Sequence, residues 1–279
     1  MKTRDFPKQL ARTLIVLVAA SGVALATLSN DVRERVVNSA VLLKLNYNME
    51  TDSYAKRFHM QVAKTPTASV RCSGTFIKHG DKAYILTAAH CTEGSKKTRT
   101  ETVDGKDRKV VYYDDAEFVT QIVKNGRKVG EISGIAKVLA AGDIEENGGD
   151  DLAILEPYDP DMARGAAEFA TKGALKDYDI GSDIYNCGSL YGEFQGSLLK
   201  GIVSSRGFLY ENKAFDTTDL SIRPGSSGSS VQAIANGKPY IVGVITRGDN
   251  KGAFGMYVGP ERLHEWLVKN KLGFLVGEK

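Results

Sequence analysis

Residues that commonly bind metals are scarce in this sequence, which has four histidines and three cysteines in 279 residues. These residues also lack the compact spacing of metal ligands. The sequence therefore predicts no metal site, and nothing in it indicates a cofactor.

A strong charge of either sign is also absent. The 37 basic and 34 acidic side chains leave a formal net charge of +3, far from the clustered basicity of a nucleic-acid binder. Nucleic acid is therefore not a predicted partner. The densest basic run, Lys96 to Lys109, is interrupted by acids and has no aromatic residue. We interpret it as a solvated loop, with a docking patch as the weaker alternative.

Internal repeats and low-complexity tracts are missing, and the 42% hydrophobic content is that of an ordinary globular chain. A chain of this length buries a large core and fits one domain or two lobes.

The N-terminal 28 residues carry the one long uncharged stretch, Thr13 to Leu28, after four basic residues in the first twelve positions. The stretch is short for a bilayer span of ~20 residues, and the sequence ALA at 24–26 offers small residues for signal cleavage. We predict that residues 1–28 are a signal peptide cleaved after Ala26 or, alternatively, an uncleaved signal anchor; a buried globular helix is a third, weaker interpretation. The first two interpretations predict an exported protein, either secreted or membrane-anchored, in the periplasm or outside the cell.

Residues 29–59 are predicted to be a helix and a linker. The sequence NDVRERVVNSAVLLKL, which begins at Asn30, has a capping residue, early acids and apolar residues at helical spacing as far as Leu43. The mixed sequence from residue 46 to about residue 60 is interpreted as a linker.

From residue 60 to residue 279 the texture changes to short apolar or alternating runs separated by turn residues, which predicts an all-β barrel or sandwich. The predicted strands are ASVRCSGTFI, AYILTAA, AEFVTQIV, GIAKVLAA, DLAILEP, DIYNCGSL, SLLKGIVSS, SSVQAIA and YIVGVITRG. A closing helix is predicted from Pro260, with an apolar stripe of Leu263, Trp266 and Leu267 and a stop at Gly273.

Three short motifs contain residues that can perform acyl transfer: His90 in TAAHC, Asp151 in GGDDLAILEP and Ser227 in RPGSSGSS. Each has an ordinary structural explanation when taken alone. Together they supply a base, a carboxylate that can orient the base, and a nucleophile. The glycine-rich context of Ser227 also lets two N–H groups, those of Gly225 and Ser227, converge on one negative oxygen.

These motifs occur in the order His, Asp, Ser and resemble those of a trypsin-like (chymotrypsin-fold) serine protease, with GSSGS in place of the usual G-D-S-G-G. The stretch TDLSIRPGSSGS is especially similar to T-D-A-A-I-N-P-G-N-S-G-G of the high-temperature-requirement (HtrA-like) proteases. GSLLKGIVSS and IVGVITRG also resemble strands of that family. The resemblance covers about residues 60 to 270.

The resemblance implies two packed six-stranded antiparallel β-barrels, with His90, Asp151 and Ser227 meeting between them. The chain is then expected to be a serine endopeptidase that acts on protein or peptide substrates. An esterase with the same three residues, and a catalytically inactive protease-fold binding protein, are the alternatives.

Cys72 and Cys91 match a pair that is bridged in many trypsin-like enzymes, and a disulfide fits the predicted export. Cys187 is then left over; we expect it to be buried in a strand, with a reactive thiol or an intermolecular bridge as alternatives.

The family's specificity pocket corresponds to Ser221, Ile222, Thr246, Arg247, Gly248 and Gly255. With no aspartate at its base, we expect a small or medium apolar residue before the cleaved bond, with Ile222 as a wall of the pocket. Arg247 could alternatively favour an acidic side chain near that residue.

Three features depart from the relatives. Ser226 stands where an aspartate pairs with a newly cut N-terminus in digestive enzymes, so we expect no zymogen switch of that kind. Ser229 replaces a glycine beside the nucleophile and could disturb the donor loop. The sequence ends shortly after the predicted closing helix, so we expect no PDZ domain, and the family's oligomers are not carried over.

Overall fold

The structure is a computed structural model that describes residues 28–48, 67–103, 106–144, 149–171, 173–248 and 254–277. Residues 1–27 of the predicted signal sequence and most of the predicted linker lie outside these ranges. Within them, no helix combines the length and the apolar character needed to cross a membrane.

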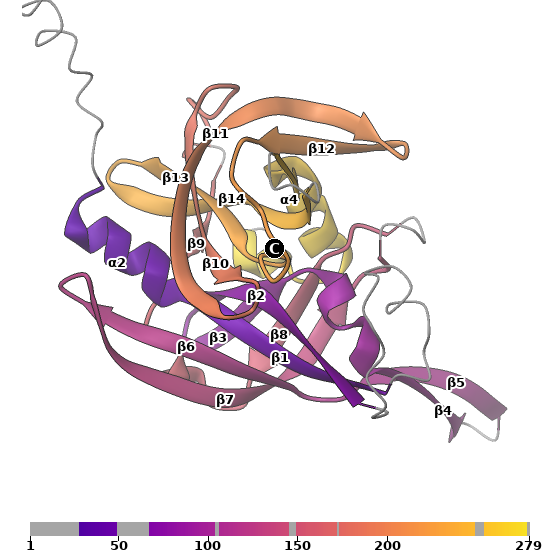
Figure 1. The fold of residues 1–279 in the computed structure, drawn as a ribbon. Helices are drawn as coiled ribbons and strands as arrows, with labels where there is room; N and C mark the ends of the chain where they lie inside the picture. The colour runs from indigo at the N-terminus through magenta and orange to yellow at the C-terminus, as the bar shows by residue number, and fades with distance from the viewer. Residues whose placement is uncertain are drawn as a thin grey trace, which may run out of the picture.

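The first half of the described chain forms a closed antiparallel barrel, which occupies the lower part of Figure 1. Its strand order is β1-β2-β3-β8-β7-β6. The strands are β1 (Ala40–Asn48), β2 (Thr67–His79), β3 (Lys82–Thr87), β6 (Ala116–Lys124), β7 (Arg127–Ala141) and β8 (Ala153–Pro157). Side chains such as Leu43, Phe76, Ile85 and Phe118 fill its interior and are fully buried. Burial of this apolar surface stabilises the barrel.

The second half forms another ring of strands above the first (Figure 1). Its order is β13-β10-β11-β12-β15-β14, and β13 also pairs with β14, which closes the ring; β9 is added in parallel to β14. The strands are β9 (Glu168–Phe169), β10 (Asp183–Leu190), β11 (Phe194–Tyr210), β12 (Lys213–Thr218), β13 (Ser230–Ala235), β14 (Lys238–Gly248) and β15 (Gly255–Val258). The predicted all-β fold with two barrels is confirmed, with β9 as a short addition.

The predicted N-terminal helix is wrong in its second half. Helix α2 covers Asn30–Ser39, and the chain continues directly as β1, which pairs with both β2 and β6. The barrel therefore begins at Ala40, within the range that we assigned to a helix and a linker. In AVLLKLNYN, Val41 and Leu43 face the barrel core. Alternating apolar residues over such a short stretch also satisfy helical spacing, so the sequence does not distinguish a helix from a strand here. Pairing with two neighbouring strands makes this segment a strand.

The basic run that we interpreted as a loop is a two-stranded hairpin. Strands β4 (Lys96–Val103) and β5 (Lys106–Tyr113) pair antiparallel and project from the first barrel. The run KKTRTETV places threonine at alternate positions, and β-branched residues favour extended backbone. The charges obscured this pattern in the sequence.

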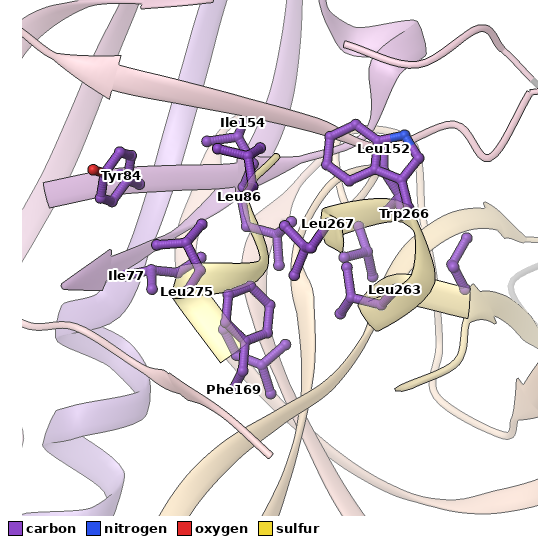
Figure 2. Close-up of a cluster of buried hydrophobic side chains, with 14 of the residues drawn as sticks. Ile77, Tyr84, Leu86, Leu152, Ile154, Phe169, Leu263, Trp266, Leu267 and Leu275 are labelled. Carbon is purple, nitrogen blue, oxygen red and sulfur yellow. The ribbon is translucent and has the colours of Figure 1, made fainter. Parts of the chain in front are cut away.

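Helix α4 (Pro260–Lys269) begins at the predicted proline and ends before Gly273, where a 3₁₀ turn begins instead. Its three predicted apolar residues are buried in a cluster with β3 and β8 of the first barrel. Figure 2 shows Leu263, Trp266 and Leu267 near Leu152 and Ile154. The helix therefore joins the two barrels by apolar packing at the start of β8.

Candidate active site

His90 lies in a 3₁₀ turn, Ala89–Cys91, which follows the end of β3. A disulfide fixes the turn at its last residue, Cys91. Cys91 forms a disulfide with Cys72 of β2, with Cα atoms 6.0 Å apart, within the usual range for such a bridge. The disulfide that the resemblance implied is therefore present, and it holds the turn against the barrel.

Asp151 lies just before β8 and has no exposed surface. Its backbone is left-handed, with φ of 54°, an uncommon conformation for a residue with a side chain. The Asp151 N–H donates to the carbonyl of Asp143 (3.1 Å), and its own carbonyl accepts from Ala89 N–H (3.0 Å). These bonds attach the loop before β8 to the histidine turn.

The carboxylate of Asp151 accepts two hydrogen bonds from His90. Oδ1 accepts from the His90 backbone N–H at 2.7 Å, and Oδ2 lies 2.7 Å from ring Nδ1. Both side chains are almost completely buried. Because a carboxylate only accepts, the proton on this edge of the ring is on Nδ1, which leaves Nε2 of the neutral imidazole as the basic nitrogen.

The loop that carries Ser227 lies against the end of β3 and the strand before it. Ser73 N–H of β2 donates to the carbonyl of Ser227 at 2.8 Å, and that carbonyl lies 3.7 Å from Sγ of Cys91. A Cβ on Gly228 would collide with Thr87 and Ala88, so only glycine permits this approach. The Asp151 segment is thus hydrogen-bonded to the histidine turn, and the Ser227 segment is hydrogen-bonded to β2, which the disulfide joins to the same turn. Ser227 is partly exposed at this junction of the barrels.

Ile222 is 4% exposed and lies between two glycines of the predicted pocket. A Cβ at Gly255 would lie 2.5 Å from Ile222 Cγ1, and one at Gly248 would lie 2.9 Å from Cγ2. Thr246 is buried, whereas Ser221 is exposed. The Ile222 side chain therefore packs against both Gly248 and Gly255.

Arg247 is packed against the hairpin between β11 and β12. Its guanidinium lies over the Tyr210 ring, 5.0 Å from the centroid, and 3.6 Å from Glu211 Oε2. The charge that we considered as an attraction for acidic substrates thus already faces a carboxylate of this chain.

Cys187 is a buried free cysteine in β10, where it packs with Val36, Val37 and Ala40. Burial raises the pKa of its thiol to about 12. The neutral thiol is a poor nucleophile, so the expectation of a buried cysteine is met and a reactive thiol is contradicted.

Cys72, His90 and Cys91 place ligand-type atoms within 4.8 Å of one another. The two sulfurs are bonded to each other and so are not available as thiolate ligands. This cluster is therefore a disulfide beside the histidine, and it is unsuited to a metal ion.

Two contributors to the site had no sequence signal that we recognised. Ser73 hydrogen-bonds the loop that carries Ser227 (the nucleophile loop of the proposal below, Pro224 to Gly228) through its backbone and its side chain, and Tyr191 N–H donates to the carbonyl of Pro224 at 2.6 Å. Ser73 directly follows a bridged cysteine, whereas Tyr191 lies in a turn with φ of 55°. Neither residue type marks a catalytic motif by itself.

The model of the trypsin-like peptidase domain matches residues 72–244, whereas no curated protein matches the sequence. Among solved structures, the chain is similar to the HtrA-type protease AlgW with a tripeptide, at 18% identity over 86% of this chain and 62% of AlgW, with a TM-score of 0.55. It is also similar to the active form of the Rv3671c protease of M. tuberculosis (16% identity, 91% and 88% coverage, TM-score 0.52) and to Deg5 (14%, 95% and 98%, 0.51). The chain spans about two thirds of the length of the AlgW chains. At these identities, the likeness establishes a shared fold.

Proposed function

Because the chain belongs to the trypsin-like peptidase family, we propose that it is a serine endopeptidase that cleaves protein or peptide substrates through Ser227, His90 and Asp151. The observation that carries this proposal is the buried contact between His90 and Asp151, at 2.7 Å from ring Nδ1 to the carboxylate. The peptide complexes of AlgW support a peptide as the substrate. Export of the protein, suggested by residues 1–28, is part of the same proposal.

The carboxylate prepares the imidazole for its role. With the Nδ1 proton donated to Asp151, the opposite nitrogen of His90 can accept the proton of the Ser227 hydroxyl as that oxygen attacks the substrate carbonyl. The imidazolium that forms is stabilised by the buried negative charge beside it. It then gives its proton to the leaving amine, and water hydrolyses the acyl-enzyme by the same route.

The peptide planes around Gly225 and Ser227 support the proposed oxyanion hole. A trans peptide directs its C=O and N–H to opposite sides. Tyr191 N–H binds the carbonyl of Pro224, and Ser229 N–H binds that of Ser226 at 3.0 Å. The N–H groups of Gly225 and Ser227 therefore point away from these partners. Among the described residues, neither N–H donates to a backbone carbonyl, so both can receive the oxygen that becomes negative.

A serine-directed fluorophosphonate tests the proposed nucleophile. We expect a single adduct on Ser227 in the purified protein, because His90 is the proposed base for this hydroxyl. Peptide mass analysis would locate the adduct. His90→Ala should abolish labelling, whereas His79→Ala, which replaces a histidine that packs on Phe274, should label normally. Absence of labelling in the folded protein would favour the inactive binding protein instead.

The proposed pocket prefers substrates with a small or medium apolar residue immediately before the cleaved bond. Ile222 fills the space between Gly248 and Gly255 and so leaves less room for a large side chain. We expect Ile222→Ala to raise kcat/KM for substrates with leucine or phenylalanine at that position, relative to alanine, by about 10- to 200-fold. Matched peptides that differ only at this residue provide the measurement. Ile241→Ala, which removes an equally buried side chain from a different cluster, should leave the ratio unchanged. A strong preference of the unmodified protein for lysine or arginine would contradict the pocket assignment.

A further inference from the structure

Ser73 has a side chain that contacts two different loops of the second barrel. It is fully buried in β2 of the first barrel. Its hydroxyl donates to the carbonyl of Gly225 at 2.7 Å and accepts from the backbone N–H of Ser189 at 2.8 Å. A hydroxyl has one proton to donate and can accept as well, so both roles are used together.

The two loops that Ser73 joins are the two that meet at the proposed oxyanion hole. Ser189 begins the turn in which Gly192 N–H donates to the Ser189 carbonyl at 3.0 Å, and Tyr191 of this turn holds the carbonyl of Pro224. Gly225 has φ of 91°, and a Cβ there would collide with Ser189 and Gly192. The turn and the nucleophile loop are therefore in direct backbone contact, with the Ser73 hydroxyl bonded to both.

The bonds on consecutive carbonyls fix every peptide plane from Pro224 to Gly228. The acceptors and their donors are Pro224 with Tyr191 N–H, Gly225 with Ser73 hydroxyl, Ser226 with Ser229 N–H and hydroxyl, and Ser227 with Ser73 N–H. Ser73 donates to two of these four carbonyls. Without its hydroxyl, the Gly225–Ser226 peptide would lose the donor on its carbonyl, and the Ser189–Gly192 turn would lose the acceptor of its Ser189 N–H. The Pro224–Gly225 peptide, which carries the Gly225 N–H, is held by Tyr191 of that turn, so displacement of the turn would turn this donor away from the substrate.

These hydrogen bonds to the carbonyls of Pro224, Gly225, Ser226 and Ser227 come from neutral groups, whereas the Ser189–Gly192 turn also accepts a bond from Arg71 Nη1 at the Gly192 carbonyl, at 3.1 Å. Ser226 is buried, and its hydroxyl lies 3.4 Å from Arg223 N–H. From its sequence position, Ser229 was expected to be able to disturb the donor loop, but its side chain is instead bonded within the loop. It is buried, and its hydroxyl donates to the Ser226 carbonyl at 2.6 Å and accepts from Asn186 Nδ2 at 2.8 Å. Neutral hydroxyls thus bond the loop directly.

We propose that the Ser73 hydroxyl is a positioning group that holds the Gly225 N–H toward the substrate by joining the Ser189–Gly192 turn to the nucleophile loop. The proposal rests on the proposed peptidase function. Ser73 acts through the loop and does not touch the substrate, so its loss should weaken binding of the tetrahedral intermediate while substrate binding in the ground state is retained.

Steady-state hydrolysis of a peptide substrate by Ser73→Ala tests this proposal. We expect kcat to fall by about 10- to 100-fold, somewhat less than the loss of a complete oxyanion donor, with KM within about twofold. The inhibition constant of a peptidyl trifluoromethyl ketone, whose adduct with Ser227 places an oxyanion at the same point, should rise by the same factor as kcat/KM falls.

Ser39→Ala is the matched control, because Ser39 is an equally buried serine whose hydroxyl bonds the Val36 carbonyl, away from the loop. Both variants lose one buried hydroxyl, so similar decreases in melting temperature are expected, whereas only Ser73→Ala should lose kcat. Ser229→Ala should have a smaller effect, because the Ser229 N–H still holds the Ser226 carbonyl.

The outcomes separate the two proposals. Equal kcat and equal inhibitor affinity in Ser73→Ala and Ser39→Ala would overturn the positioning role, even if hydrolysis depends on Ser227. Hydrolysis that is absent, or unaffected by Ser227→Ala, would overturn the peptidase function itself. If Ser73→Ala does not fold, Ser73→Gly removes the same hydroxyl and is measured in its place.

Discussion

Ser227→Ala is expected to reduce kcat for peptide hydrolysis by about 10⁶-fold, the scale on which the loss of such a nucleophile acts when three residues work as a unit. The substitution removes only the attacking oxygen. The carbonyl of residue 227 would still accept the Ser73 N–H bond that fixes the loop. Substrate should therefore bind with nearly unchanged affinity while turnover disappears.

The measurement pairs steady-state hydrolysis with equilibrium binding of the same peptide, for example by fluorescence anisotropy. Ser39→Ala should hydrolyse at the rate of the unmodified protein. Retention of more than about 1% of kcat in Ser227→Ala would show that another group attacks the substrate, because an oxyanion hole alone does not supply that much of the rate.

Asp151→Asn is expected to lower kcat by about 10⁴-fold at neutral pH, through the tautomer of His90. Asp151 accepts the backbone N–H of His90 at Oδ1 and the ring Nδ1–H at Oδ2, and an amide has an acceptor oxygen at only one of these two positions. If the amide oxygen keeps the backbone N–H, the amide NH₂ faces Nδ1. The ring proton then moves to the opposite nitrogen, which can no longer take a proton from Ser227.

Asp150→Asn is the matched control for this prediction. Asp150 is adjacent in sequence, but it pairs with Arg262 at 2.9 Å on the side of α4. Its loss should change kcat by no more than a few fold and melting temperature by a few degrees, because a partly exposed pair contributes about 1 kcal/mol or less. Similar losses of kcat in both variants would mean that loop position, and not the His90 tautomer, controls the rate. Imidazole NMR of the two variants would report the tautomer directly.

Most strands were predictable because each carries its own pattern. DLAILEP and YIVGVITRG are apolar runs bounded by turn residues, and they form β8 and part of β14. The short strands β9, β12 and β15 were missed. In β15, the sequence GMYV carries too few residues to show a period, and its extended form depends on pairing with β12 and β14.

The candidate site was predictable where it follows a motif. TAAHC identified His90, and the bridged pair of Cys72 and Cys91 followed from the resemblance. The preference of Asp151 over Asp150 was also a sequence prediction, and Asp151 is the one of the two that contacts His90. The contribution of Ser73 was not predictable, because its two partners lie 116 and 152 residues further along the chain.

The sequence by itself determined the residue types and the local turns: a histidine at the end of a strand, a carboxylate before another strand, and a serine among glycines that permit close backbone approach. These properties depend on neighbours in the chain, through side-chain period and allowed backbone angles. Only the tertiary structure decided that Ala40–Asn48 is a strand, that Ile222 lies between two glycines, and that Ser73 attaches the nucleophile loop. Those outcomes depend on contacts between residues far apart in the sequence, which form only when the strands of each barrel and, for Ser73, the two barrels have come together.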